Sequence, residues 1–190
     1  MMINEAPGAR PDAGSGRRRR LWFIGPAAFA AALTLIAFAL PGGHFLGVLA
    51  ALGAWLLAGV WWLILLVGPG TRRSTLNAWP PIIGVVTAAL VVTGLPTRVA
   101  FLASEPALLH YAESLPAGED YVSVDRFVGV FPISDVQRSE GALIFGVDGV
   151  GGLLEQCGFT YAPGVDAKGL PVTTADHLTG DWYATCTDFD

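Results

Sequence analysis

Charged residues are scarce in this sequence. Asp, Glu, Lys and Arg make up 14% of its 190 residues, whereas hydrophobic residues make up 53%. A soluble domain usually carries about 25% charged residues, so the composition predicts a membrane protein. Cations are the scarcer kind: Lys168 is the only lysine and the formal net charge is −5. That balance argues against a nucleic-acid partner, because nucleic-acid binding rewards a basic surface.

The usual sequence signatures of catalysis and metal binding are also missing. No GxSxG motif of a nucleophile elbow surrounds any of the candidate serines: Ser104, Ser114, Ser123, Ser134 and Ser139. The glycine-rich stretch 146–152 lacks the Lys-Ser/Thr ending of a phosphate-binding loop. The sequence has no CxxC pair and no closely spaced pair of histidines. We therefore assign no catalytic, cofactor-binding or metal-binding residue and expect no cofactor.

The sequence does contain three long runs without a charged side chain, at residues 21–40, 45–67 and 79–95. A helix of about 20 residues is roughly 30 Å long, which matches the hydrocarbon core of a bilayer. We therefore predict a membrane α-helical fold with three transmembrane helices in residues 21–97. Residues 1–20 mix glycine, proline and charge without apolar periodicity, so they are expected to be a disordered cytoplasmic tail.

The arginines predict the orientation of these helices. Arg17–Arg20 and Arg72–Arg73 flank the runs on one side of the membrane, and short loops rich in arginine stay in the cytoplasm. The chain is thus expected to be a multi-pass protein of the cell membrane with an extracytoplasmic segment at residues 98–190. Alternatively, the first run belongs to a cleaved signal peptide, with Ala37-Phe38-Ala39 at the cleavage site. Residues 98–190 lie outside in either case.

The extracytoplasmic segment is acidic and contains both cysteines. Residues 105–190 hold fourteen of the sixteen acidic residues of the chain. Three cations oppose them: Arg126, Arg138 and Lys168. Cys157 and Cys186 are expected to form a structural disulfide because the compartment is oxidising. Closing this loop is worth about 3–4 kcal/mol on the chain-entropy model. The rival interpretations, a metal pair or a catalytic thiol, need a Cys/His grouping that is absent here.

This segment is predicted to be a small α+β domain. A helix is expected over residues 104–115, with Ser104 as its N-cap and Pro106 in its first turn. Its apolar residues recur at helical spacing: Leu108, Tyr111, Ala112 and Leu115. Four runs rich in β-branched and aromatic residues predict strands: residues 126–136, 142–147, 152–161 and 182–189. Pairing of the last two brings the cysteines together. We expect an antiparallel sheet of about four strands, with residues 162–174 as an exposed loop.

Three motifs extend these expectations. They are RVAFLASEP at residues 98–106, CGFTY at residues 157–161 and HLTGDWY at residues 177–183. Together they resemble a group of small, uncharacterised actinobacterial membrane proteins, over roughly residues 20 to 190. The resemblance implies three transmembrane helices and an extracytoplasmic C-terminal domain. It implies no activity, so no functional residue follows from it.

The predicted helices contain no ionisable group of the kind that marks a transport pathway in a membrane. Thr34, Thr87 and Thr93 are expected to bond to their own helix backbones. Small residues at helical spacing are typical of close helix packing: Ala50, Ala54, Ala58, Gly84 and Ala88. Besides the lipid bilayer, the expected partners are a second copy of this chain, packed through these small-residue faces, or another envelope protein.

Two classes of function remain. The missing catalytic signatures favour a membrane-anchored interaction or accessory protein of the cell envelope. The alternative is an extracytoplasmic hydrolase that uses His177 or His110 with a nearby carboxylate or serine. A bolder hypothesis is calcium binding through Asp188 and Asp190 or through Asp148, although the ligand order of an EF-hand is missing. The glycines that follow Asp148 are more simply explained as a hairpin turn.

Overall fold

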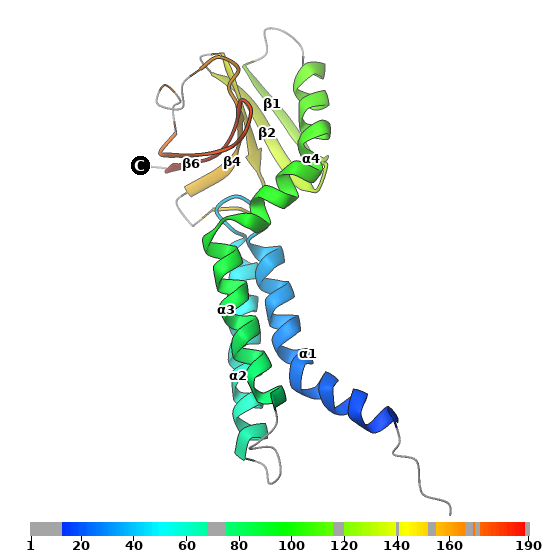
Figure 1. Ribbon diagram of the computed structural model, residues 1–190. Coiled ribbons are helices and arrows are strands. Elements are labelled where there is room, and N and C mark those ends of the chain that lie inside the picture. The colour runs from blue at the N-terminus through cyan, green and yellow to red at the C-terminus, as the bar shows by residue number, and fades with distance from the viewer. Residues whose placement is uncertain are drawn as a thin grey trace, which may run out of the picture.

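A computed structural model of the chain describes residues 13–67, 75–115, 120–139, 141–151, 155–165, 169 and 172–188. The helices are α1 (Ala13–Ala37), α2 (Phe45–Val67), the short 3₁₀ helix η1 (Thr75–Ala78), α3 (Trp79–Val92) and α4 (Leu95–Ser114). The strands are β1 (Tyr121–Val128), β2 (Phe131–Ser139), β3 (Ala142–Val147), β4 (Glu155–Tyr161), β5 (Thr174–Thr179) and β6 (Trp182–Asp188). Helices α1, α2 and α3 form an elongated stalk, and α4 and the strands form a head at one end of it (Figure 1).

Small residues let α1 and α2 pack closely. The buried alanines of the two helices are Ala27, Ala30, Ala31 and Ala37 on α1 and Ala51 and Ala58 on α2. Because alanine side chains are small, the two backbones can approach each other at these positions. Gly84 of α3 lies against the Trp55 ring of α2, and a Cβ atom added there would be in ordinary van der Waals contact with the ring, at 3.7 Å. Among the predicted small-residue positions, Ala58 is buried within the stalk, whereas Ala50 and Ala88 are exposed.

Several polar side chains of the stalk form hydrogen bonds within it. Trp55 donates its indole N–H to Thr34 Oγ1 at 2.9 Å. Thr34 in turn donates to the carbonyl oxygen of Ala30 at 2.8 Å. Thr87 and Thr93 likewise donate to carbonyl groups of their own helix, at 2.7 and 2.9 Å. The prediction that the three threonines bond to their own helix backbones is confirmed.

Among the described residues, one helix is long and apolar enough to cross a membrane by itself. It is α2, whose bounds match the predicted run 45–67. Helices α3 and α4 qualify only together, as one span bent by 58°. The apolar part of α1, Leu21–Ala37, is shorter than such a span. The expectation of three separate full-length transmembrane helices is therefore not confirmed.

The ends of the other two predicted helices differ for local reasons. Gly94 follows α3 with φ +65°, a left-handed conformation that ends the helix at Val92 rather than at residue 95. Helix α1 begins at Ala13, within the segment that was expected to be a disordered tail. Arginine and alanine are strong helix formers, which explains why the helix extends into this charged segment. Residues 1–12 lie outside the described part of the chain.

Helix α4 starts earlier than predicted. It begins at Leu95 with Pro96 in its first turn, so Ser104 is not an N-cap and Pro106 lies inside the helix. The Gly94-Leu95-Pro96 sequence supplies the helix start that was assigned to Ser104 and Pro106. Ser104 is fully buried, and its Oγ accepts a hydrogen bond from the backbone N–H of Val130 at 3.0 Å. It therefore holds the turn between β1 and β2 against α4.

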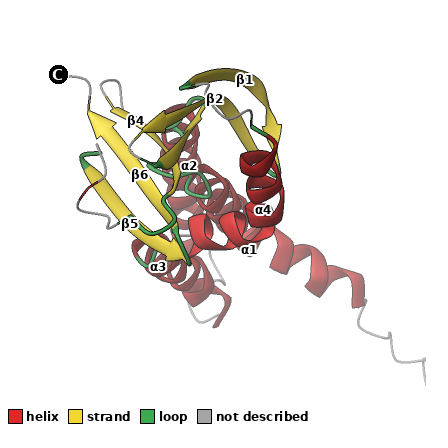
Figure 2. Cartoon of the chain, turned by 90° about the horizontal axis from the view of Figure 1, so that it is seen from above, coloured by secondary structure: helices red, strands yellow, loops and turns green. Residues whose placement is uncertain are grey.

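The sheet has six antiparallel strands in the order β1-β2-β3-β4-β6-β5, and it is strongly curved (Figure 2). The predicted number of about four strands is too low for two reasons. A turn at Gly129, with φ +63°, divides the run 126–136 into the end of β1 and the first part of β2. Strand β5 lies within a segment that was assigned to a loop or left unassigned. It is a polar edge strand, so it lacks the apolar alternation that reveals a strand.

Aromatic rings fill the space between α4 and the sheet. Phe131 and Phe159 lie with ring centroids 4.6 Å apart, and Phe145 and Trp182 with centroids 5.6 Å apart. Phe101 of α4 contacts this group, 5.2 Å from Phe159. The predicted apolar face of the helix is confirmed, because all four of its residues belong to this core or pack against it: Leu108, Tyr111, Ala112 and Leu115.

The head and the stalk meet at the turn between α1 and α2, residues 41–44. Gly151 donates its backbone N–H to the carbonyl oxygen of Gly43 at 3.1 Å. His44 forms an isolated β-bridge with Val150, and its Nδ1 accepts a hydrogen bond from the N–H of Gly47 at 3.0 Å. A side chain on Gly42 would overlap the sulfur atom of Cys157. The turn is thus packed directly against the disulfide and the β3–β4 connection, and we call this contact the joint.

The contact between α4 and the β1–β2 turn predicts a specific sensitivity at Gly129. A Cβ atom there would lie 2.5 Å from Ser104 Cβ. Gly129→Ala should therefore lower the free energy of unfolding by about 1–3 kcal/mol beyond the cost of positive φ. Gly164→Ala is the matched control, because Gly164 also has positive φ, at +73°, but no atom within 4 Å of the added carbon. Denaturant unfolding of the detergent-solubilised full chain, followed by near-UV circular dichroism, measures both; equal losses would refute the contact.

Candidate functional site: a polar hollow on the open face of the sheet

The two faces of the sheet differ in chemistry. One face carries the aromatic core under α4. The other, which we call the open face, carries a polar hollow of about 260 Å³. Successive side chains of a strand alternate between faces, so β4 directs Cys157 and Phe159 toward the core and Gln156 toward the open face. The side chains around the hollow come from β2, β3, β4 and β6: Asp135, Gln137, Ser139, Ile144, Gln156, Thr185 and Thr187.

Two glycines form the floor of the hollow. Gly146 of β3 and Gly158 of β4 are directly paired in the register of the sheet. A Cβ atom on Gly158 would overlap the carbonyl oxygen of Phe145, and one on Gly146 would overlap the Asp135 carboxylate. Glycine is thus required at position 158, where the obstacle is backbone, whereas a side chain at position 146 would displace the Asp135 carboxylate. A pair of strand residues without side chains leaves space above the sheet.

Among the described residues, Asp135 is the only charged one that lines the hollow. The register of β2 and β3 shifts between Ile133 and Asp135, and such irregularities redirect side chains. Asp135 Oδ1 accepts hydrogen bonds from Ser134 Oγ at 2.7 Å and from Gln156 Nε2 at 3.4 Å. No described residue bonds to Oδ2. The hollow therefore presents a half-buried carboxylate, which accepts hydrogen bonds, beside carboxamides, which donate and accept them.

The neighbouring residues make the hollow rigid. The hydroxyl groups of Thr160 and Thr185, both buried, lie 2.8 Å apart and form a hydrogen bond between β4 and β6. A small apolar cluster, separate from the main core, packs around Ala142 and Ala162. Its partly buried members are Val165, Val172 and Tyr183. A preformed polar hollow of this kind is suited to binding, since few groups must be ordered when a ligand enters.

The predicted disulfide is present. Cys157 of β4 and Cys186 of β6 are directly paired in the sheet, and their sulfur atoms are bonded at 2.03 Å. Glu155 lies close enough to both sulfur atoms to suggest a metal site by proximity alone. The rival interpretations, a metal pair or a catalytic thiol, do not fit this arrangement, because sulfur in a disulfide offers no thiolate to bind a metal or act as a nucleophile.

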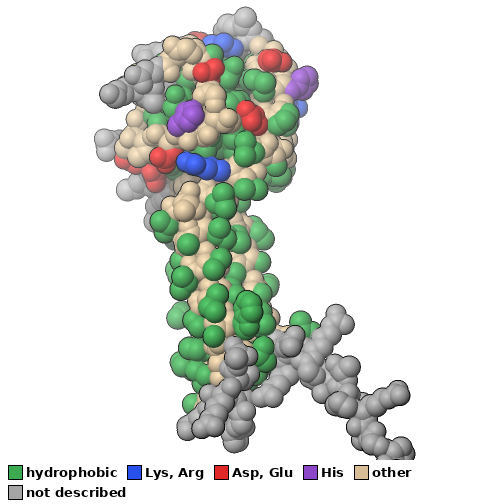
Figure 3. All heavy atoms as spheres, in the orientation of Figure 1, with side chains coloured by type: hydrophobic (Ala, Val, Ile, Leu, Met, Phe, Trp, Pro, Cys, Tyr) green, Lys and Arg blue, Asp and Glu red, His purple; other side chains and the backbone are tan. Residues whose placement is uncertain are grey.

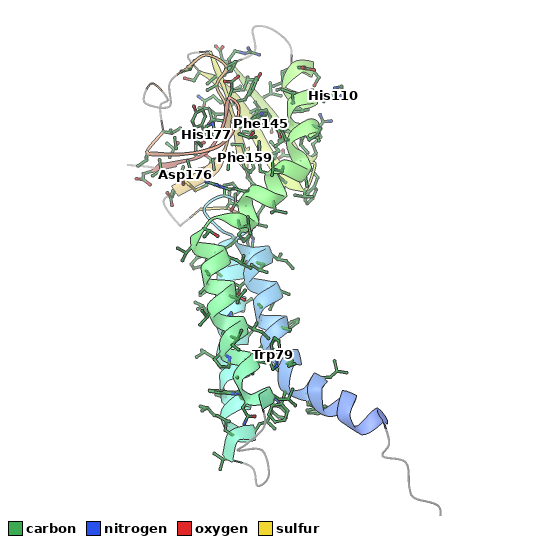
Figure 4. The ribbon with its side chains drawn as sticks, in the orientation of Figure 1. Trp79, His110, Phe145, Phe159, Asp176 and His177 are labelled. Carbon is green, nitrogen blue, oxygen red and sulfur yellow. A yellow bond between two sulfur atoms is a disulfide. The ribbon has the colours of Figure 1, made fainter. Side chains whose placement is uncertain are left out.

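The structure does not bring the predicted histidines together. His110 is exposed on α4, and His177 is exposed on β5, on another side of the head (Figure 4). His177 Nε2 is 2.9 Å from the carbonyl oxygen of Gly180, and its ring meets Tyr183 edge-on. Within the described segments, neither imidazole bonds to a serine or carboxylate side chain. The serines of the hydrolase hypothesis are placed elsewhere: Ser104 in the core, Ser114 on α4, Ser123 beside Asp125, and Ser134 and Ser139 on β2.

The residues of the calcium hypothesis occupy separate places. Asp148 is exposed and directly follows β3, where its N–H bonds to the carbonyl oxygen of Pro132. Asp188 is the exposed last residue of β6, and it lies opposite Glu155 in the register of β4 and β6. Asp190 lies outside the described residues.

Sequence reasoning missed the hollow. Gly146 and Gly158 were the available signal, because each lies inside a run that is otherwise typical of a strand. A glycine at such a position indicates that backbone or a ligand approaches closely. Their direct pairing depends on the register, which the sequence does not reveal. No family model, curated protein or solved structure matches this chain. The resemblance to small actinobacterial membrane proteins therefore stays a prediction.

Removal of the disulfide should destabilise the head. The double variant Cys157→Ser, Cys186→Ser should lose about 3–4 kcal/mol of unfolding free energy, because 29 residues separate the two cysteines. Non-reducing peptide mapping of the native chain should yield one linked peptide pair. Free thiols at both positions in freshly prepared membranes would contradict the assignment.

Proposed function

We propose that this chain is an integral membrane protein that holds its head outside the cytoplasmic membrane, where the open-face hollow binds a component of the cell envelope. The membrane location rests on the apolar surface of the stalk and the binding role on the hollow. This makes the chain an interaction or accessory protein of the envelope rather than an enzyme.

The apolar surface of the stalk supports the membrane location. Only 11% of the most apolar 18-residue stretch of α2 is buried inside the protein, whereas a core helix of a soluble protein is mostly buried. Leu57 of α2, Ile36 of α1 and Val85 of α3 are 74%, 68% and 71% exposed. Hydrophobic side chains cover the visible stalk, while charged side chains gather on the head (Figure 3). A soluble protein rarely exposes so continuous an apolar surface, so we assign α1 and α3, as well as α2, to the lipid.

Tryptophans support the same placement. Trp61 and Trp62 lie in the half of α2 remote from the head, and the Trp22 ring packs against that of Trp61 in a tilted arrangement, with centroids 5.5 Å apart. Trp61 donates its indole N–H to the carbonyl oxygen of Trp22 at 3.1 Å, and Trp62 donates to that of Asn77 at the same distance. Tryptophan favours the interface between lipid and water. The neighbouring arginines, Arg17–Arg20 and Arg72–Arg73, favour the cytoplasmic interface for this end.

Cysteine labelling in intact cells tests the orientation. The described chain has no free cysteine, so a single introduced thiol is the reactive one. Ser123→Cys, on an exposed position of β1, should react with a membrane-impermeant maleimide in intact cells. Ser74→Cys, next to Arg72–Arg73, should react only after lysis. The reverse pattern would refute the proposed orientation, and labelling of both sites in intact cells would refute a cytoplasmic position for the 68–74 segment.

Site-specific photo-crosslinking tests the binding role of the hollow. A benzophenone side chain at Gln137 lies on the open face, whereas one at the neighbouring exposed Arg138 points to the other face. In intact cells, Gln137 should give an adduct that Arg138 does not. Asp135→Asn should abolish this adduct because it removes the charge that the described residues place in the hollow. Adducts that are equal at both positions, or that persist in Asp135→Asn, would show that the hollow is not the binding site.

A further inference from the structure

A second hollow lies where the head meets the stalk. Its volume is about 290 Å³, and four parts of the chain line it, β6 among them through Ala184. The turn between α1 and α2 contributes Gly42, the junction of α3 and α4 contributes Val92 and Arg98, and β5 contributes Asp176 and His177. Asp176 and His177 lie at the base of the head, above the end of α3 (Figure 4). We call this hollow the junction cleft.

The junction cleft presents two opposite charges that are not paired with each other. Arg98 and Asp176 both line it, and both are exposed. Neither side chain forms an ion pair or hydrogen bond with a described residue. Two unpaired groups of opposite sign in one cleft are complementary to a ligand that itself carries a separated negative and positive charge.

An apolar stripe leads away from the cleft along α3. Val92 lines the cleft and is 87% exposed. Val85, which is 71% exposed, lies seven residues earlier and therefore on the same face of the helix. The exposed Ala88 and Ala89 lie between them. If the stalk is in lipid, this stripe faces acyl chains, and the junction cleft lies at the level of the outer headgroups.

We propose that the junction cleft binds a phosphatidylethanolamine molecule of the outer leaflet. Its phosphate contacts Arg98, whose guanidinium suits phosphate oxygens. Its ammonium donates to the Asp176 carboxylate, and one acyl chain lies along Val92 and Val85. This inference rests on the membrane insertion proposed above.

The chemistry distinguishes this lipid from two others. Phosphatidylcholine carries a quaternary ammonium, which has no N–H to donate to Asp176. Phosphatidylglycerol has no cation and is repelled by the acidic head, since residues 105–190 hold fourteen acidic residues. The preference should therefore depend on Asp176, whereas the affinity for any phospholipid should depend on Arg98.

Native mass spectrometry of the detergent-solubilised full chain tests this proposal, with each of the three lipids added in turn. Phosphatidylethanolamine should be retained in preference to the other two. Arg98→Gln and Asp176→Asn should each weaken its retention about tenfold, as expected for loss of one charge-assisted contact. Arg138→Gln and Asp148→Asn are matched controls, because these residues are exposed elsewhere on the head and should leave retention unchanged.

A charge reversal sharpens the test. Asp176→Lys should shift the preference from phosphatidylethanolamine to phosphatidylglycerol, because the cleft then presents two cations. Equal retention of the three lipids, or the same loss in the control variants, would overturn the proposal. Cysteine labelling separates this failure from that of the proposed function. A chain that is inserted as expected but shows no lipid preference would refute only the lipid site. A chain that lies outside the membrane would refute both the lipid site and the proposed membrane location.

Discussion

The apolar surface of α1, α2 and α3 is the constraint on which the rest of the structure depends. Side chains such as Leu56 and Leu57, 72% and 74% exposed, gain nothing from water, and the stalk offers no partner to cover them. In the proposed placement a lipid bilayer would cover this surface and leave only its ends in contact with water. The tryptophan-rich end and the head would then belong to opposite interfaces. The position of the head, and of both of its hollows, follows from this placement.

The disulfide links the open-face hollow to the stalk. Cys157 packs beneath the turn at Gly42, whereas its neighbours Gln156 and Gly158 belong to the open-face hollow. Strand β4 is thus shared between the joint and the hollow. Further hydrogen bonds cross the joint, among them that from Thr97 Oγ1 of α4 to the carbonyl oxygen of Phe38 at 2.8 Å. The head is held to the stalk by short, direct contacts rather than by a linker.

Local patterns predicted the elements whose signals are local. Helix α2 follows from an uninterrupted apolar run, and strand β3 from its β-branched and aromatic residues. The pairing of Cys157 with Cys186 follows because the segment contains only these two cysteines. The errors arose where tertiary contacts decide. Gly129 forms a turn because Ser104, 25 residues earlier, holds it, and β5 is a strand because β6 pairs with it. The open-face hollow is defined by two missing side chains and a register, neither of which appears as a motif.

Fluorescence quenching in bilayers of acyl-brominated lipids tests the proposed insertion most directly. The reconstituted native chain has five tryptophans on the stalk and one, Trp182, in the core of the head. Strong quenching of the native emission is expected. No quenching is expected in a variant whose stalk tryptophans are all replaced by phenylalanine, which leaves Trp182 as the single emitter. Quenching of Trp182 to the native extent, or native emission that brominated lipids do not reduce, would contradict the proposal that the stalk lies in the membrane and the head outside it.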